Sequence, residues 1–422
     1  MRAVWRPSWV IPFRKSPGLV QDTLAVTPVV GTVMVLLVAS IGVGSILVWG
    51  VPNMEDEQSN AEFAGILNQF YSFDSIAENV MHGGSAGKAS KGTLSIPGGT
   101  VQRTDGNWFV ISYYPKNIHG GDVYDFSPSG FHTIAEPKDE LVITNDGVDV
   151  TDPKIILETV WSTFHVVRNI ATPASWDSGT SYTVSVLDPA EFNSYPTRLR
   201  VQDETTGDDL VVMWFYPMGA LEYQTETSSG VLNIALENAA VLTTRPGGTG
   251  LRDKPLLTQE FTSAAHPDEL TFMAMFFMLF VDNVTTPGIS AGGAGNYPLL
   301  FSLKSNNLRT NGTEVYRVQV DMVGARTSAW MDYYTRYYGF VEDETAVDPV
   351  VRAERQAGAN LGVYDFVMME SLMELTLQME DMEISTRPPP PPPGGPGPGV
   401  PGPPSSCSGI KCVNSGWPTN LR

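Results

Sequence analysis

The sequence has little cysteine and few basic side chains. Only two cysteines occur among 422 residues, which excludes a disulfide-rich scaffold and a multi-cysteine metal cluster. Acidic side chains outnumber basic ones, 46 against 26, and the formal net charge is −20. Because such a charge repels a phosphate backbone, we expect no nucleic-acid partner. Charged residues make up 17% and hydrophobic residues 42% of the chain, proportions that are typical of a folded protein.

Charge is absent from one long stretch near the N-terminus. From Thr23 to Met54 there is no Asp, Glu, Lys or Arg, and Val, Leu, Ile, Gly and Ala dominate. About 20 apolar residues suffice for a helix to cross a bilayer. A helix in the core of a soluble protein usually carries a polar stripe, and none is visible here. We therefore expect a transmembrane helix over residues 23–54, with the lipid bilayer as its partner.

The charges that flank this stretch predict its orientation. The segment before it is basic, with Arg2, Arg6, Arg14 and Lys15. The segment after it begins with Glu55, Asp56 and Glu57. The positive-inside rule places the basic flank in the cytoplasm. We expect a single-pass protein of the cell membrane with residues 1–22 as a basic cytoplasmic leader and the bulk of the chain outside. A cleaved secretory signal has an apolar region of only about 7–15 residues, so anchoring is the better interpretation.

A second apolar pattern predicts an amphipathic helix over residues 55–84. Its apolar residues recur at spacings of three and four: Phe63, Ile66, Leu67, Phe70, Phe73, Ile76 and Val80. Such spacing places them on one helix face. The sequence His82-Gly83-Gly84 ends the pattern, as expected at a helix C-terminus.

From residue 85 to residue 386 the pattern indicates mostly β structure. We expect strands at Thr93–Ile96, Trp108–Tyr114, Tyr182–Leu187, Leu210–Tyr216, Val315–Val323 and 373–380, which are rich in β-branched and aromatic residues or alternate between apolar and polar ones. Two stretches favour helix instead, Lys154–Ile170 and Asp268 to about Val281. The predicted fold class is α+β, with the long N-terminal helix followed by a β-rich, sandwich-like extracellular domain.

The last part of the chain differs in composition. Residues 387–406 are rich in proline and glycine, which predicts an extended, semi-rigid linker. A short tail over residues 407–422 contains Cys407 and Cys412. A local disulfide between them is the leading interpretation outside the cell, with free thiols or bridges to another chain as alternatives. A metal site is disfavoured because no histidine lies nearby.

Motifs that carry catalysis are missing. The histidines are scattered without an H-E-x-x-H pair, and no G-x-S-x-G elbow occurs. Asp146, Asp149 and Asp152 lie close in sequence, but their spacing does not match an EF-hand loop, so an acidic surface turn is the simpler interpretation. We expect neither catalysis nor a cofactor. Asn283-Val-Thr285 and Asn311-Gly-Thr313 fit the N-glycosylation acceptor pattern.

The start of the apolar helix carries a family signature. Ala25-Val26-Thr27-Pro28-Val29-Val30-Gly31 resembles the N-terminal motif of archaeal type IV pilins and pilin-like surface proteins, usually A-V-S-P-V-I-G. The resemblance implies a class III leader, which a prepilin peptidase would remove near Ala25 and Val26. It also implies other pilin subunits and the pilus assembly machinery as partners.

Weaker similarity to large pilin-like proteins continues in the body. It involves Leu94-Ser-Ile-Pro-Gly-Gly, Gly219-Ala-Leu-Glu-Tyr223, Glu237-Asn238-Ala-Ala-Val241 and Ala329-Trp330. Since 422 residues exceed a typical major pilin, we expect a non-catalytic minor or tip subunit, or an anchored pilin-like protein, in the membrane or in a surface filament. The alternative is a single-pass surface adhesin or receptor that never enters a filament. A tethered extracellular enzyme is less favoured.

Overall fold

A computed structural model describes most of the chain. The described residues are 28–82, 85–115, 124–129, 139–161, 164–227, 230–245, 248–253, 259–266, 269–285, 294–338, 350–356, 361–367 and 372–385. The expected leader (1–22), the Pro/Gly-rich linker (387–406) and the tail (407–422) lie outside them.

The described residues form helices at the N-terminus and strands over most of the remainder. The helices are α1 (Pro28–Ser45), the π-helical η1 (Ile46–Gly50), α2 (Val51–Met81), α3 (Pro189–Ser194) and α4 (Thr327–Tyr338). The first ten strands are β1 (Ala89–Ile96), β2 (Thr100–Pro115), β3 (Phe126–Ser129), β4 (Glu140–Asn145), β5 (Val150–Thr151), β6 (Pro153–Trp161), β7 (Phe164–Ala171), β8 (Ser175–Trp176), β9 (Thr180–Ser185) and β10 (Thr197–Asp203). The others are β11 (Asp209–Thr227), β12 (Gly230–Glu237), β13 (Ala240–Arg245), β14 (Gly248–Asp253), β15 (Gln259–His266), β16 (Glu269–Thr285), β17 (Gly295–Val323), β18 (Val350–Gln356), β19 (Leu361–Val367) and β20 (Met373–Ser385).

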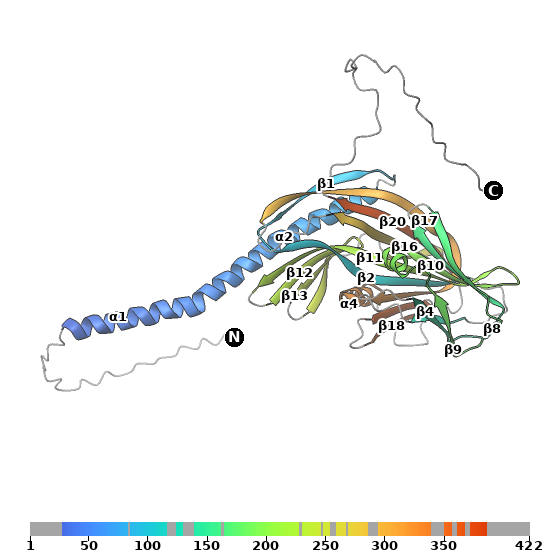
Figure 1. Ribbon diagram of the computed structural model, residues 1–422, viewed down its shortest axis with the longest axis horizontal. Coiled ribbons are helices and arrows are strands. Elements are labelled where there is room, and N and C mark those ends of the chain that lie inside the picture. The colour runs from blue at the N-terminus through green and yellow to red at the C-terminus, as the bar shows by residue number, and fades with distance from the viewer. Residues whose placement is uncertain are drawn as a thin grey trace, which may run out of the picture.

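The N-terminal helices form one continuous rod. From Pro28 to Met81 each helical segment begins where the previous one ends, and at 1.5 Å per residue the rod is about 80 Å long. In Figure 1 the α1 half extends away from the β domain, whereas the α2 half lies along it. The rod ends at Met81, directly before the sequence His82-Gly83-Gly84 that was expected to end it, whereas the expected start at Thr23 lies outside the described residues.

Most strands belong to one 15-stranded sheet with the central order β14-β13-β12-β11-β2-β17-β20-β16-β15. Its pairings are antiparallel except that β16 runs parallel to β20. The sheet curves strongly, so that β11 approaches β16 where Gly219 faces Val281. A Cβ added at Gly219 would lie 2.2 Å from the Val281 carbonyl oxygen, so only glycine permits this approach.

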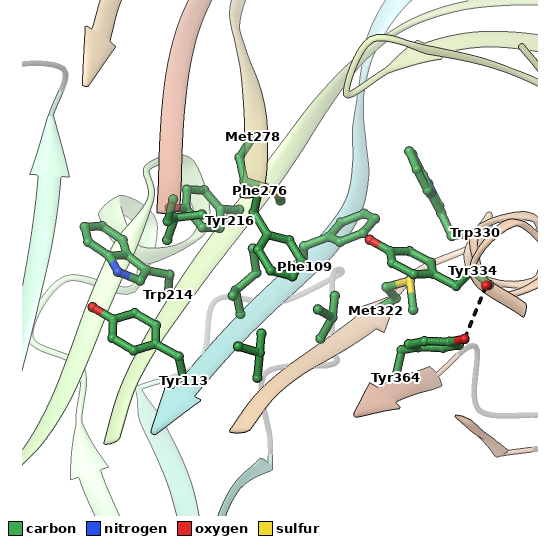
Figure 2. Packing of buried hydrophobic residues seen from close by; sticks show 14 of the residues in the cluster. Phe109, Tyr113, Trp214, Tyr216, Phe276, Met278, Met322, Trp330, Tyr334 and Tyr364 are labelled. Atoms are coloured by element: carbon green, nitrogen blue, oxygen red, sulfur yellow. Dashed lines mark hydrogen bonds between the residues drawn. The ribbon is translucent and has the colours of Figure 1, made fainter. Parts of the chain in front are cut away.

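Three clusters of buried side chains make up the core. The first lies between α4 and the main sheet (Figure 2) and includes Phe109 and Trp330, whose rings meet edge to face at 5.1 Å. The second fills the space between α2 and the sheet. The third lies where the small sheet β3-β4-β9 covers β6, β10 and β11. Packing of one sheet over another is seen in the third cluster, and the β-rich α+β prediction is confirmed.

Both helices predicted inside the β domain are wrong. Residues 154–161 and 164–170 lie on the paired strands β6 and β7, and residues 269–281 lie on β16. The two faces of β16 serve different cores, because Phe276 and Met278 enter the first cluster whereas Leu279 and Val281 enter the second. A strand buried on both faces has no polar positions that alternate with apolar ones. Its continuous apolar run therefore gives the same sequence pattern as a buried helix.

Candidate functional site: the N-terminal helix and its junction with the β domain

Among the described residues, none covers the apolar half of the rod. The segment Gly31–Val48 has 18 residues, a mean hydropathy of 2.3 and no buried residue. Val38 is 67% exposed and Val48 is 73% exposed. Monomeric soluble proteins rarely expose a continuous apolar patch of more than a few hundred Å². At 1.5 Å per residue the segment is about 27 Å long, close to the roughly 30 Å hydrocarbon thickness of a bilayer.

Two polar side chains of this segment form hydrogen bonds within the helix. The Ser40 hydroxyl donates to the Leu36 carbonyl oxygen at 2.7 Å, and the Ser45 hydroxyl donates to the Ile41 carbonyl oxygen at 2.8 Å. An unpaired hydroxyl costs free energy in a hydrocarbon environment. These two bonds remove that cost, so the segment is compatible with lipid along its length.

A π turn separates the apolar half of the rod from the half that is packed. In η1 the backbone N–H of Val51 bonds to the Ile46 carbonyl oxygen, which closes the wider turn. Pro52 follows directly and has no backbone N–H to donate. Single π turns relieve such irregularities without breaking a helix. The rod therefore passes from its exposed half to its packed half without interruption.

The α2 half is bound to the sheet through one apolar face. Phe63, Ile66, Phe70 and Phe73 are at most 1% exposed. The Phe73 ring lies 5.5 Å from that of Phe301 on β17. Burial of each such side chain is worth about 1.5–3 kcal/mol, so this face alone holds the helix firmly on the domain.

Two features show how closely β1 and α2 fit together. A Cβ at Gly92 would lie 2.8 Å from the Phe73 ring, so glycine makes room for the aromatic side chain. The Gln69 amide bonds in both directions with Ser95, donating to its carbonyl oxygen at 3.0 Å and accepting from its N–H at 2.6 Å. The helix thus satisfies both backbone hydrogen-bonding groups of Ser95 on β1.

A buried ion cluster joins β11 and β12 to the start of α4. The Arg326 guanidinium donates to Glu222 at 2.5 Å and to Glu237 at 2.9 Å. The Trp330 N–H also donates to Glu237, at 2.9 Å, and the Asn107 side-chain oxygen accepts from the Arg326 backbone N–H at 3.1 Å. All of these residues are buried, which indicates a structural role rather than contact with a substrate.

This cluster brings together three of the weaker motifs found in the sequence. Glu222 comes from Gly219–Tyr223, Glu237 opens Glu237–Val241, and Trp330 belongs to Ala329-Trp330. Arg326 was missed by sequence analysis, because an isolated arginine in a turn gives no signal of its carboxylate partners.

Around Arg317 lies a second polar cluster that the sequence analysis also missed. Its guanidinium pairs with Asp125 at 2.8 Å and with Asp365 at 2.9 Å. The Gln319 amide donates to Asp321 at 3.0 Å. Burial raises the pKa of Asp321 to about 7, with the nearby Asp365 charge acting in the same direction and the Gln319 hydrogen bond and the Arg317 charge opposing it. The two-residue spacing of the three β17 side chains places them on one face.

The structure describes the two expected glycosylation acceptors but not the expected cleavage site or the cysteine pair. Ala25, Val26, Cys407 and Cys412 lie outside the described residues. Asn283 lies within β16, and Asn311 is exposed on β17, where Gly312 has a φ of +61°. Both acceptor predictions stay predictions.

The acidic stretch predicted as a surface turn forms local hydrogen bonds. Asp149 accepts from the Ser178 backbone N–H at 2.8 Å, and Asp146 accepts from the Ser127 hydroxyl at 3.2 Å. Within the described part of the chain, no group of three or more His, Cys, Asp or Glu side chains is arranged to hold a metal ion.

Comparison of the whole chain with known proteins finds no matching family model, no matching curated protein and no matching solved structure. The functional proposal therefore rests on the geometry of the rod and on the sequence signature at its start.

Proposed function

We propose that this chain is a non-catalytic, pilin-like surface protein, held in a lipid bilayer by α1 with its β domain outside the cell. The observation that carries the proposal is the contrast along one continuous helix. In the described part of the chain no residue of Gly31–Val48 is buried, whereas the Phe63–Val80 face is buried in the β domain. A rod that is half exposed and half packed suits a subunit whose exposed half enters another apolar environment.

The energetics favour such an environment. Eleven large apolar side chains are exposed between Val33 and Val48. Covering them is worth on the order of 20 kcal/mol, at about 2 kcal/mol for each. A whole domain is typically stable by only about 5–15 kcal/mol, so exposure of this segment to water is a large penalty. Lipid, or the helices of neighbouring copies, would remove it.

The pilin route adds processing and assembly to this anchor. By resemblance, a prepilin peptidase would cut near Ala25 and Val26, next to the first described helical residue, Pro28. The apolar rod would then form the mature N-terminus and leave the bilayer only when helices of other subunits replaced its lipid contacts. The large β domain at the other end favours a minor subunit, a tip subunit or an anchored pilin-like protein.

The N-terminal mass of the native protein tests this route. A mature chain that starts near Val26 supports leader cleavage, and an intact Met1 contradicts it. Surface shearing followed by immunoblotting tests assembly. Protein in the sheared filament fraction supports a pilus subunit. Protein found only in the membrane fraction contradicts filament assembly and favours the alternative, an anchored adhesin or receptor.

A further inference from the structure

An irregularity in β17 directs one arginine into the core face of the sheet. Opposite β20, Leu308 pairs with Gln378 and Thr310 pairs with Leu377, with a register shift between them. Arg309 is therefore the extra residue of a β-bulge. Bulges re-aim side chains and are over-represented beside functional sites. Here the Arg309 guanidinium carbon lies 5.3 Å from the ring centroid of Trp214 on β11.

A second guanidinium lies against the same indole. The Arg198 guanidinium carbon is also 5.3 Å from the Trp214 centroid, but Arg198 has a carboxylate partner, Glu158, at 2.6 Å. Among the described residues no carboxylate lies within ion-pair distance of Arg309. Burial lowers the pKa of Arg309, and so does the Arg198 charge, against opposing effects of Tyr216 and Asp381. A partly buried cation of this kind is stabilised by a counter-ion.

Hydrogen-bond donors without acceptors gather at the same place. The Arg309 Nε–H and the Tyr216 hydroxyl are buried and have no hydrogen-bond partner in the described part of the chain. The Trp214 N–H faces the Tyr113 hydroxyl (Figure 2) without a hydrogen bond of regular geometry. The Trp214 and Tyr216 rings stack at 5.9 Å. Native proteins leave few such groups unpaired, and buried Tyr and Trp usually find partners.

We propose that Arg309, Tyr216 and Trp214 form a binding site for a small oxyanion, either a free ion such as phosphate or sulfate or the carboxylate of an acidic sugar. The oxyanion accepts from the Arg309 Nε–H and the Tyr216 O–H and neutralises the Arg309 charge. Charge-assisted bonds of this type are the strongest hydrogen bonds in proteins. The side chain of Arg198, the other guanidinium beside Trp214, is 22% exposed. The site does not depend on α1 and is independent of the proposed anchoring.

Calorimetric titration of the full-length protein in detergent micelles tests the site. The probes are sodium phosphate, sodium sulfate and sodium glucuronate, each at a constant ionic strength set with sodium chloride. We expect saturable binding of at least one probe and a matching rise in Tm, because a ligand that binds only the folded state stabilises it. The preferred probe distinguishes a free ion from an acidic sugar.

Three variants separate specific binding from general charge effects. Arg309→Met keeps an apolar stem and removes the cation, and we expect at least a tenfold loss of affinity. Tyr216→Phe keeps the ring and removes only the hydroxyl, and we expect a smaller loss with the fold intact. Arg103→Met, at an exposed position of β2, is the matched control and leaves binding unchanged. Absence of saturable binding for all three probes overturns the proposal, as does equal affinity of Arg309→Met, Tyr216→Phe and the wild type.

Discussion

At the residue scale, buried charge is the feature that most constrains this domain. Arg326 pairs with two carboxylates, on β11 and β12, and Arg317 pairs with Asp365 on the neighbouring strand β19 and with Asp125. Buried ion pairs are weak contributors to stability compared with apolar packing, but breaking one leaves an uncompensated charge. The contribution of these ion pairs to stability is therefore measured mainly when one charged partner is removed.

Removing the Arg326 guanidinium leaves the buried carboxylates of Glu222 and Glu237 without a counter-charge. We expect Arg326→Met to lower the free energy of unfolding by about 3–5 kcal/mol, measured by urea denaturation followed by tryptophan fluorescence. The triple variant that adds Glu222→Gln and Glu237→Gln should recover part of the lost free energy of unfolding, because it removes the two unpaired negative charges. If the triple variant is as unstable as the sum of its single changes, the charge explanation is wrong.

The buried Asp321 makes stability depend on pH. Its pKa in the folded protein, about 7, lies above the ordinary value of 3.8, so the folded state favours the protonated form. The stability contributed by this group is fully present below pH 3.8 and is lost as the pH rises through 7. We expect Asp321→Asn to stabilise the protein at pH 8 by up to about 4 kcal/mol and to change stability much less at pH 5.

Denaturation of Asp321→Asn at both pH values provides the measurement, with the exposed Asp332 as the matched control. Asp332→Asn should leave the difference between pH 5 and pH 8 unchanged. Equal effects of Asp321→Asn at both pH values would show that Asp321 is ionised throughout.

At the element scale, α2 connects the apolar rod to the β domain, and Phe73 lies at the centre of that connection. We expect Phe73→Ala to destabilise the domain by about 3–5 kcal/mol, because it leaves a cavity against Phe301 and Gly92. Hydrogen exchange should then accelerate along α2 more than in the central strands. Asn68→Ala, on the exposed side of the helix, is the control and should change stability by less than about 0.5 kcal/mol.

The elements differ in how well the sequence predicts them, for a physical reason. The α2 helix buries one face and exposes the other, so its period of 3.6 is visible in the sequence. The strands β6 and β16 are buried on both faces, so no alternation distinguishes them from helix. Lys154–Ile170 and Asp268–Val281 were mistaken for helices on that account.

The residues around Arg309 could not be predicted for a different reason. A β-bulge and the curvature of the sheet bring Arg309 to Trp214, and neither leaves a periodic signal in the sequence. The exposed apolar segment is the opposite case. Its composition alone predicted the location of Gly31–Val48, because an apolar run without charge has few other uses.

At the scale of the whole molecule, the protein is a domain on a rod (Figure 1). The domain carries most of the chain's acidic excess, and the rod's first half carries no charge. A strongly acidic domain stays soluble and is repelled by an anionic membrane surface, while the rod partitions into apolar surroundings. This division of properties is expected of a subunit that is anchored in a bilayer and extends outward from it.

The partition of the full-length protein between membrane and soluble fractions after alkaline carbonate extraction tests the central claim most directly. The claim is that lipid surrounds Gly31–Val48. We predict that the protein stays in the membrane pellet and is released only by detergent. Quantitative release into the detergent-free supernatant as a stable monomer would contradict the claim and the surface role proposed from it.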